Sequence, residues 1–242
     1  MKAFVINLAR SVDRREAMAR QLEDLSINYE FFRAIDAGAG EHLSFPNCIG
    51  DRPGRSGKPL VAGESGCFAS HYLVWKRAIS AGEKVVVLED DDVLHPGILD
   101  ALSIAEKALD DWPYVRLCGL LPRPLVTLAE RGGYRLVRYL KGPFGGQAYA
   151  LSPDGARRLV AKADRWTEPV DIYLDRFWFH GVPCLGLLPY RVTLAPTPSD
   201  IGERAGYVAG DRFRRMMCDI PDGLRRRVWN LRHLPGQTYQ GP

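Results

Sequence analysis

The chain has 242 residues, of which 46% are hydrophobic and 26% charged, and a formal net charge of +4, values that suit one compact domain with extensions. No stretch approaches the roughly 20 uncharged apolar residues of a membrane span, and charges follow the first apolar run too early for a signal peptide, so a cytoplasmic protein is expected. The five cysteines are scattered and never form a CxxC pair, which indicates neither a disulfide framework nor a cysteine zinc site.

The N-terminal segment reads as a strand, a helix and a second strand. The apolar run at residues 2–9 predicts a buried strand. Asp13 and Glu16, three positions later, form a capping-box pattern, so a helix is expected to begin at Asp13. The aromatic segment 29–37 predicts the second strand. This is βαβ order from the first residue.

A loop-rich segment separates this unit from the next helix. Residues 38–63 are rich in Gly, Pro and Ser, and 50–59 is a candidate mobile loop. A mostly buried helix is predicted over 63–82, where Gly82 ends it. The strand predicted at 84–92 has the continuous hydrophobicity of the centre of a parallel sheet.

The second half of the chain continues the alternation. His95-Pro96 is expected to start a helix, and Ser152-Pro153 to open another with an N-cap and a proline in the first turn. The remaining predicted elements are strands at 114–119, 142–152 and 183–192 and a helix at 169–181. Alternating strands and helices predict an α/β fold with a mainly parallel central sheet flanked by helices.

Four consecutive carboxylates follow the apolar strand: Glu89, Asp90, Asp91 and Asp92. Adjacent carboxylates repel one another and raise each other's pKa unless a cation lies among them. Alternate side chains of a strand share a face, so either Glu89 with Asp91 or Asp90 with Asp92 is available to chelate a divalent ion. A solvated turn before the next helix explains one or two acids, but four beside the core favour a metal.

The chemistry of these side chains indicates which metal. Mg²⁺ and Mn²⁺ prefer carboxylate oxygen and often combine one or two protein carboxylates with phosphate oxygens of a substrate. The carboxyl end of a central parallel strand is also where open α/β sheets bind ligands. The sequence therefore predicts a Mn²⁺ or Mg²⁺ site with Glu89, Asp91 and Asp92 as candidate ligands, and a catalytic role for Asp91.

Five segments occur in a recognisable order along the chain. They are VINLARSVDRR (5–15), GESGCFASH (63–71), VVVLEDD (85–91), GGQAYALSPDGARRL (145–159) and PVDIYLD (169–175). In this order and rough spacing the chain resembles the family-25 glycosyltransferases, and among them bacterial lipooligosaccharide galactosyltransferases, over about residues 1–195. Single motifs of this length are weak evidence, but five in order are hard to obtain by chance.

The resemblance implies a GT-A-like nucleotide-binding fold, a UDP-sugar donor, a divalent metal and, as in most relatives, inversion at the anomeric carbon. The usual family motif is EDD followed by a variable residue, which maps onto Glu89, Asp90 and Asp91. Asp92 departs from that pattern. Because this extra acid makes the pair Asp90 and Asp92 equally available, the pair that faces the metal stays open at this point.

Polar residues beyond the first two strands are candidates for binding the donor. Asn7, Arg10 and Arg14 follow the first strand, where they can bind the base, ribose or diphosphate of a nucleotide, although a solvated helix start explains the arginines equally well. Asp36 follows the second strand and is a partner for uracil or ribose by position alone.

Later motifs add further donor-binding candidates. His71 lies on the helix before the acidic strand and is expected to contact donor sugar or phosphate, with a buried structural histidine as the alternative. Gln147 can donate and accept hydrogen bonds to sugar hydroxyls. The remaining candidates are Glu64, Ser70 and Asp90.

An inverting transfer needs a base that removes the proton of the acceptor hydroxyl. Asp171 and Asp175 are four positions apart on one face of a predicted helix. We predict Asp171 as the base, with Glu168 and Asp175 as alternatives. If none of these acids is catalytic, they simply form an exposed acidic face of the helix.

The excess positive charge of the chain is concentrated near its C-terminus. Residues 212–232 hold seven arginines and two aspartates, a local charge of +5, interleaved with apolar side chains. We therefore expect a glycosyltransferase domain at 1–195 and a basic extension at 196–242. Such a segment suits peripheral contact with an anionic inner membrane, although packing against the domain explains it equally well. No nucleic-acid motif accompanies it.

The sequence thus predicts a metal-dependent, inverting transferase that moves galactose from a UDP donor to a lipid-linked saccharide of the lipopolysaccharide type. The enzyme alternative is a sugar nucleotidyltransferase, although the segment after the first strand lacks the expected glycines. The other alternative is an inactive relative that binds without turnover.

Overall fold

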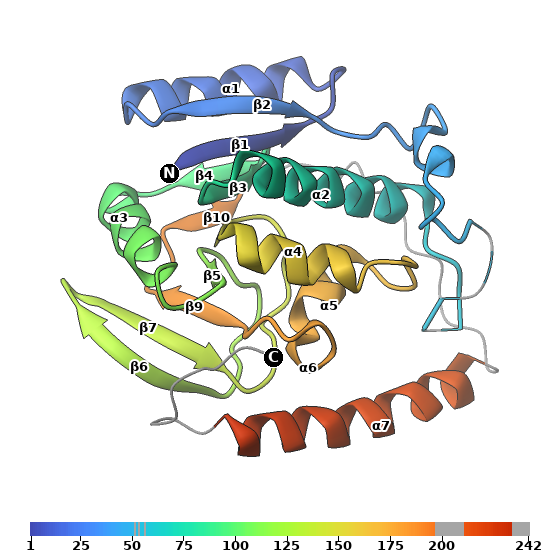
Figure 1. The fold of residues 1–242 in the computed structure, drawn as a ribbon. Coiled ribbons are helices and arrows are strands. Elements are labelled where there is room, and N and C mark those ends of the chain that lie inside the picture. The colour runs from blue at the N-terminus through green and yellow to red at the C-terminus, as the bar shows by residue number, and fades with distance from the viewer. Residues whose placement is uncertain (51, 53, 56, 197–210, 234–242) are drawn as a thin grey trace.

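The computed structural model describes residues 1–50, 52, 54–55, 57–196 and 211–233 (Figure 1). It contains an eight-stranded sheet in the order β2-β1-β3-β8-β5-β9-β7-β6 and a small two-stranded sheet of β10 and β4. The strands are β1 Lys2–Asn7, β2 Tyr29–Arg33, β3 Val85–Glu89, β4 Asp92–Leu94, β5 Tyr114–Arg116, β6 Leu125–Arg131, β7 Tyr134–Tyr139, β8 Tyr149–Leu151, β9 Leu185–Leu188 and β10 Val192–Leu194. The helices are α1 Val12–Asp24, α2 Ala62–Ala81, α3 Ile98–Ala108, α4 Pro153–Ala161, α5 Val170–Asp175, α6 Phe177–His180, α7 Asp211–Arg232 and the 3-10 helix Glu41–Ser44.

The predicted α/β class, a central sheet flanked by helices, is confirmed. β1 pairs in parallel with both β2 and β3, and β5 pairs in parallel with β9. The sheet is nevertheless mixed, because β8 runs antiparallel between β3 and β5, and β7 runs antiparallel to β9 and β6. β1, β2 and β3 therefore end at one edge of the sheet, where their following loops meet.

The side chains of β3 alternate between the two faces of the sheet, and each face has its own hydrophobic core. Val85 and Val87 pack with α2, α4 and α5, whereas Val86 and Leu88 pack with α1 and α3. A strand buried on both faces has to be apolar at every position, which is why this segment reads as a continuous hydrophobic run. The residue after Leu88 continues the alternation and faces α2.

Two helix starts were predicted incorrectly by a few residues. The first helix begins at Val12 with Ser11 as N-cap, not at Asp13, and no side chain caps it. α3 begins at Ile98 behind Gly97, whose φ of 89° only glycine adopts without strain. The predicted starts at Ser152-Pro153 and end at Gly82 are confirmed, since Ser152 Oγ accepts from the Gly155 N–H at 3.1 Å and Gly82 has a φ of 67°.

The predicted helix over 169–181 is two short helices. The backbone leaves helical geometry at Arg176, between α5 and α6, with φ −89° and ψ 53°. The predicted strand at 142–152 is also shorter, because only Tyr149–Leu151 pairs with neighbours. The hairpin of β6 and β7 was not predicted, and its two-residue turn uses the positive φ of Gly132 and Gly133.

The basic segment forms α7, which runs along one end of the molecule beside α6 (Figure 1). Its Trp229 packs against Phe177 with ring centroids 6.2 Å apart, and the Asn230 side chain donates to the Leu140 carbonyl at 3.0 Å. Among the described residues no helix is long and apolar enough to cross a membrane. The rest of the predicted extension, 197–210 and 234–242, and three positions of the predicted loop at 50–59 lie outside the described residues.

Candidate active site

The acidic cluster lies where β1 and β3 end side by side. Ile6 pairs with Glu89 in the register of the two strands, which brings Asn7 next to the residues that follow β3. The Asn7 amide donates to an Asp90 carboxylate oxygen at 2.7 Å and to the Ser11 carbonyl at 3.1 Å. Asn7 therefore ties the acidic turn to the start of α1.

The four acids point in different directions. Glu89 continues the α2-facing side of β3 and lies 3.3 Å from the His71 Nε2. Asp90 points the other way, toward Asn7 and the Arg14 guanidinium, whose Nη1 is 3.4 Å from its carboxylate. Asp91 lies 3.9 Å from the same guanidinium. Glu89 and Asp90 thus face opposite sides, as strand alternation predicts.

Asp92 is folded into the turn between β3 and β4. Its side chain is 2% exposed, and one carboxylate oxygen accepts from the Glu89 N–H at 2.9 Å. Gln21 of α1 holds the same turn, donating to the Asp92 carbonyl at 3.0 Å and accepting from the Leu94 N–H at 2.9 Å. Asp92 therefore fixes the backbone conformation of the acidic turn.

Burial and mutual repulsion act on all three aspartates. Burial, followed by the charge of Glu89, raises the pKa of Asp91 to about 6. The same two causes, in the same order, raise the pKa of Asp92 well above its usual range. Burial also raises the pKa of Asp90, although the hydrogen bond from Asn7 and the charge of Arg14 offset part of the effect. The cluster has too little positive charge around it for full ionisation to be favourable.

Three buried oxygens in this cluster have no hydrogen-bond partner among the described residues. They are the Oδ1 atoms of Asn7, Asp91 and Asp92. All three are acceptors, and a buried polar atom left unpaired costs free energy. Carboxylate and amide oxygens are the ligands of hard divalent cations. The residues present therefore fit a divalent metal of the Mn²⁺ or Mg²⁺ type.

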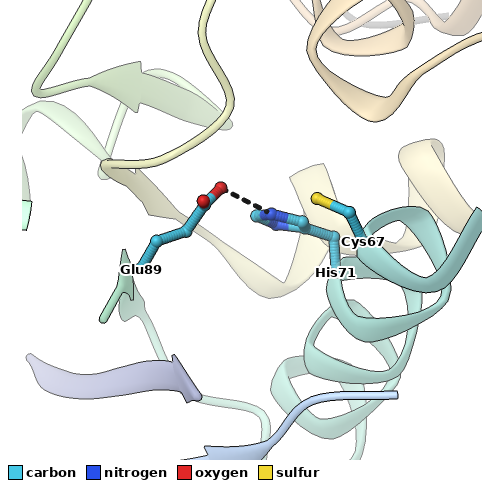
Figure 2. A group of neighbouring side chains, drawn as sticks. All are labelled: Cys67, His71 and Glu89. Atoms are coloured by element: carbon cyan, nitrogen blue, oxygen red, sulfur yellow. Dashed lines mark hydrogen bonds and ion pairs between the residues drawn. The ribbon is translucent and has the colours of Figure 1, made fainter. Parts of the chain in front are cut away.

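A hydrogen-bonded chain behind the cluster holds His71. The Trp75 indole N–H donates to the Tyr149 hydroxyl at 2.8 Å, and that hydroxyl lies 2.8 Å from the His71 Nδ1. With Nδ1 held by Tyr149, the Nε2 of His71 is directed at Glu89 (Figure 2). The His71 side chain has no exposed surface, so its ring has a fixed orientation.

Cys67 lies one helical turn before His71 and belongs to the same site. Burial raises the pKa of its thiol well above the usual range, and the charges of Glu89, Asp171 and Asp91 add to this effect in that order. The charge of Asp171, the predicted base, thus acts on the same thiol as the charges of Glu89 and Asp91. A sulfur, a ring nitrogen and a carboxylate oxygen of Cys67, His71 and Glu89 lie within 4.8 Å of one another.

The three candidates for the catalytic base differ in their partners. Asp171 is partly exposed, and one of its oxygens accepts the Ile172 N–H at 2.9 Å. Glu168 instead forms ion pairs with Arg176 and Arg55. Asp175 is paired with Arg116 at 2.6 Å and is buried. Glu168 and Asp175 are thus neutralised by buried arginines, whereas no described ion pair holds Asp171.

The glycine-rich loop before β8 lies beside Asp171. A Cβ added at Gly146 would lie 3.7 Å from the Asp171 Cα, so the two backbones are close. Gln147 is 5% exposed and its amide donates to the Cys118 sulfur at 3.1 Å. The predicted sugar-binding glutamine therefore lies near this loop, with its amide held by a core thiol.

The other predicted donor-binding residues lie beyond the ends of β1 and β2 or on α2. Arg10 and Asp36 form an ion pair beyond the ends of β1 and β2, and this pairing lowers the pKa of Asp36. Glu64 accepts from the Val61 N–H at 3.2 Å at the start of α2. Ser70 is 1% exposed, donates to the Gly66 carbonyl and accepts from the Ile35 N–H at 2.9 Å. The hydroxyl of Ser70 is thus occupied in joining α2 to the segment after β2.

Sequence reasoning missed Cys67 and Trp75 as members of this site, and it weighed Tyr149 only as a residue that could stack on a sugar or lie in the core. The spacing of Cys67 and His71, four positions apart on a helix, was a detectable signal. Tyr149 reaches His71 from β8, and nothing in the sequence pairs these two positions.

Comparison with known proteins identifies the class. The model of the family described as "Glycosyltransferase family 25 (LPS biosynthesis protein)" matches residues 1–174. The chain therefore belongs to glycosyltransferase family 25.

Individual relatives include active and inactive proteins. Procollagen galactosyltransferase 2 of Homo sapiens is 42% identical over 169 residues, which is 65% of this chain and 27% of that protein. The Mus musculus protein of the same name is 32% identical over 185 residues, 71% of this chain and 29% of that protein. Inactive glycosyltransferase 25 family member 3 of Homo sapiens is 32% identical over 186 residues, 72% of this chain and 31% of that protein. The chain thus spans under a third of the length of these relatives.

Proposed function

We propose that this protein is a metal-dependent, inverting glycosyltransferase that moves galactose from UDP-galactose to a saccharide of a lipopolysaccharide-type, lipid-linked acceptor. Membership of family 25 supports sugar transfer, and the galactosyltransferases among the relatives support galactose. The observation that carries the proposal is the group of three buried, unpaired acceptor oxygens at the carboxyl end of the parallel strands.

The proposed metal ligands are Glu89 and Asp91, with Asp92 as a third acid behind them. Asp90 is engaged by Asn7 and Arg14, which supports the Glu89 and Asp91 pair over the alternate pair. When bound, a divalent cation would offset the negative charge of the leaving diphosphate. Asp92 contributes by holding the turn through the Glu89 N–H.

We propose Asp171 as the base that takes the proton of the acceptor hydroxyl. One of its oxygens accepts the Ile172 N–H, and Asp171 lies within electrostatic reach of the same thiol as Glu89 and Asp91. The ion pairs of Glu168 and Asp175 argue against those two alternatives, because buried arginines already hold their carboxylate oxygens, which are then not available to an acceptor hydroxyl.

Two of the proposed donor-binding side chains, Arg10 and Arg14, follow the end of β1. Arg14 lies 3.4 Å from Asp90 and can bind a diphosphate through a second N–H. Arg10 with Asp36 lies where a base or ribose would reach beyond β2. For the other candidates, which are Asn7, Glu64, Ser70, His71, Asp90 and Gln147, we propose that they contact the donor or hold the side chains that do.

The outer face of α7 supports a membrane-held acceptor. Its apolar side chains recur at helical spacing and are 45–67% exposed; they are Met217, Ile220, Leu224, Val228 and Leu231. Arginines 225, 227 and 232 are exposed beside them. Apolar side chains flanked by arginine suit the surface of an anionic bilayer. We therefore propose that residues 196–242 hold the domain of residues 1–195 at the cytoplasmic surface of the inner membrane.

Vesicle co-sedimentation tests this contact. The full chain is expected to sediment with vesicles that contain anionic phosphatidylglycerol and to stay in solution with pure phosphatidylcholine. Leu224→Glu should reduce sedimentation, because it places a charge in the apolar stripe. Leu99→Glu is the matched control, since Leu99 is 51% exposed on α3 and far along the chain from α7. Equal sedimentation of both variants would contradict the proposed contact.

A catalytically inactive binding protein is the second candidate, because relatives of similar identity are named inactive. UDP release from a UDP-sugar in the presence of acceptor would argue against it, whereas tight donor binding without turnover would support it. A sugar nucleotidyltransferase would instead release pyrophosphate from a nucleoside triphosphate.

Calorimetry with a donor panel tests the main proposal. UDP-galactose, UDP-glucose, UDP-N-acetylgalactosamine and CMP-sialic acid are titrated with Mn²⁺ and again with a chelator. Chelator-sensitive binding that favours UDP-galactose is the expected result. A folded protein that binds none of the four would overturn the proposed function.

A further inference from the structure

Cys67, His71 and Glu89 bring three different donor atoms together. Cys67 and His71 are four positions apart on α2, so both side chains lie on the same face of the helix. Glu89 meets them from the end of β3 (Figure 2). The Cys67 sulfur, a His71 ring nitrogen and a Glu89 oxygen all lie within 4.8 Å of one another.

These separations are close to those around a single tetrahedral ion. With bonds of roughly 2.0–2.3 Å, ligand atoms on one zinc ion lie about 3.3–3.7 Å apart. The His71 Nε2 and the Glu89 Oε1 are already 3.3 Å apart. Since the three donor atoms lie within 4.8 Å of one another, the Cys67 sulfur has to approach by up to about 1.3 Å.

The surroundings of His71 match those of a metal-binding histidine. Metal-binding histidines usually donate their second N–H to a fixed acceptor. Here the Tyr149 hydroxyl lies 2.8 Å from Nδ1 and is itself fixed by the Trp75 N–H at 2.8 Å. Nε2 is thereby left facing Cys67 and Glu89. His71 has no exposed surface, whereas the Glu89 side chain is 26% exposed, so an ion can enter past Glu89.

We propose that Cys67, His71 and Glu89 form a site for Zn²⁺, with solvent as the fourth ligand. Sulfur and imidazole nitrogen are donors that zinc accepts and that Mg²⁺ and Mn²⁺ bind poorly. As the zinc–sulfur bond forms, the thiol proton passes to solvent. Three protein ligands with one open position are typical of zinc sites that exchange ligands.

Zinc at this position would have a consequence that rests on the proposed function. Glu89 is also a proposed ligand of the hard cation that the donor requires. Zinc would therefore remove Glu89 from the catalytic metal site and act as an inhibitor. The zinc site itself does not depend on transferase activity, so the two proposals fail separately.

The test uses the full chain, freed of metal and without a metal-binding tag. Calorimetry with Zn²⁺ against a competing chelator of known affinity is expected to show one ion per chain, with Cys67→Ser weakening the affinity at least tenfold. Co²⁺ serves as a spectroscopic substitute for zinc. We expect a near-ultraviolet thiolate-to-cobalt absorption band in the unmodified protein and none in Cys67→Ser.

Cys48→Ser is the matched control, because Cys48 is also a partly exposed free thiol and lies outside this group. It should keep both the zinc affinity and the cobalt band. Glu89→Gln should weaken zinc binding while keeping the band, because the sulfur ligand remains. Zinc binding of equal affinity in Cys67→Ser, or a band that survives that change, would overturn the proposal.

Discussion

Two groups of carboxylates in this protein differ in whether arginines balance their charge. At the turn after β3, the one ion pair described for Asp91 or Asp92 is the 3.9 Å contact of Asp91 with Arg14, and each of these two aspartates keeps a buried oxygen without a hydrogen-bond partner among the described residues. Around α5 and α7, by contrast, the buried acids Glu168, Asp175 and Asp222 each have an arginine partner. The pairs are Arg116–Asp175 at 2.6 Å, Arg176–Glu168 at 2.5 Å, Arg176–Asp222 at 3.0 Å and Arg55–Asp222 at 2.9 Å.

This difference in pairing distinguishes acids that stabilise the fold from acids that can bind a ligand. When a buried acid is paired with arginine, its charge is balanced. Such a pair joins segments that are distant in sequence, here α5, α7 and residues near position 55. Buried acids without a counter-charge are unfavourable until a cation reaches them. The arginine-paired group therefore holds the end of the domain together, whereas the unpaired group is available for a ligand.

The largest expected effect comes from breaking the paired group. Asp175→Asn removes the counter-charge of Arg116, whose side chain is only 2% exposed. We expect a loss of about 3–5 kcal/mol in the free energy of unfolding, the usual cost of leaving one partner of a buried pair alone. Chemical denaturation measures it.

Asp154→Asn is the matched control for this change. Its ion pair with Arg158 has a similar distance, 2.7 Å, but Asp154 is 53% exposed. Solvent screening limits such pairs to about 1 kcal/mol or less. If the two variants lost equal stability, the distinction between buried and exposed pairs would be wrong.

The next effect is on activity and comes from the unpaired group. Asp91→Asn removes a charge that is repelled by Glu89 and a proposed ligand of the metal. Transfer is expected to fall by about 10²–10³-fold, the usual cost of removing one electrostatic contact at a reacting group, while the melting temperature stays the same or rises. Steady-state assays and thermal unfolding measure the two quantities.

Asp100→Asn on the exposed face of α3 controls for loss of an aspartate, and it should change neither quantity. An Asp91→Asn protein with normal metal-dependent transfer would remove Asp91 from the mechanism.

A smaller effect is expected from the chain that holds His71. Tyr149→Phe leaves the Trp75 N–H and the His71 Nδ1 without their common partner. The expected loss of stability is about 1–3 kcal/mol, and the affinity for Mn²⁺ should fall about 10–100-fold, as for other residues that orient a metal site. On β7, three strands along the sheet from β8, Tyr139→Phe removes a similar hydroxyl contact with Tyr190 and should leave Mn²⁺ affinity unchanged.

The last expected effect is a pH dependence of stability beside the paired group. Burial, together with the charge of Arg176, lowers the pKa of His180 to about 3 from its usual 6.5. The folded state therefore keeps this ring neutral while the unfolded chain binds a proton below pH 6.5. Stability from this residue is complete above pH 6.5 and falls by about 1.4 kcal/mol per pH unit as the pH drops toward 3.

His180→Gln should flatten this part of the pH profile of unfolding. Comparison with the unmodified protein at pH 8 separates the cost of the lost contacts, to the Tyr173 carbonyl and the Val182 N–H, from the titration. An unchanged slope between pH 6.5 and 5 would contradict the assignment.

The sequence by itself determined the elements that form the centre of the site. The continuous apolar run of β3, the βαβ start and the position of the acids beyond a central strand all follow from local pattern. Strand alternation also predicted that neighbouring acids face different sides, as Glu89 and Asp90 do. These features are local because side-chain direction in a strand depends only on position.

Only the tertiary structure decided which acids have partners. Glu168 and Asp175 stayed open in the sequence as alternatives to Asp171, and what separates them from it is their pairing with arginines that lie elsewhere in the chain, such as Arg116, 59 positions away from Asp175. The contact of Tyr149 with His71 spans 78 positions and joins β8 to α2. Such pairings depend on how the elements pack, and packing brings together residues whose sequence positions carry no mark of the contact.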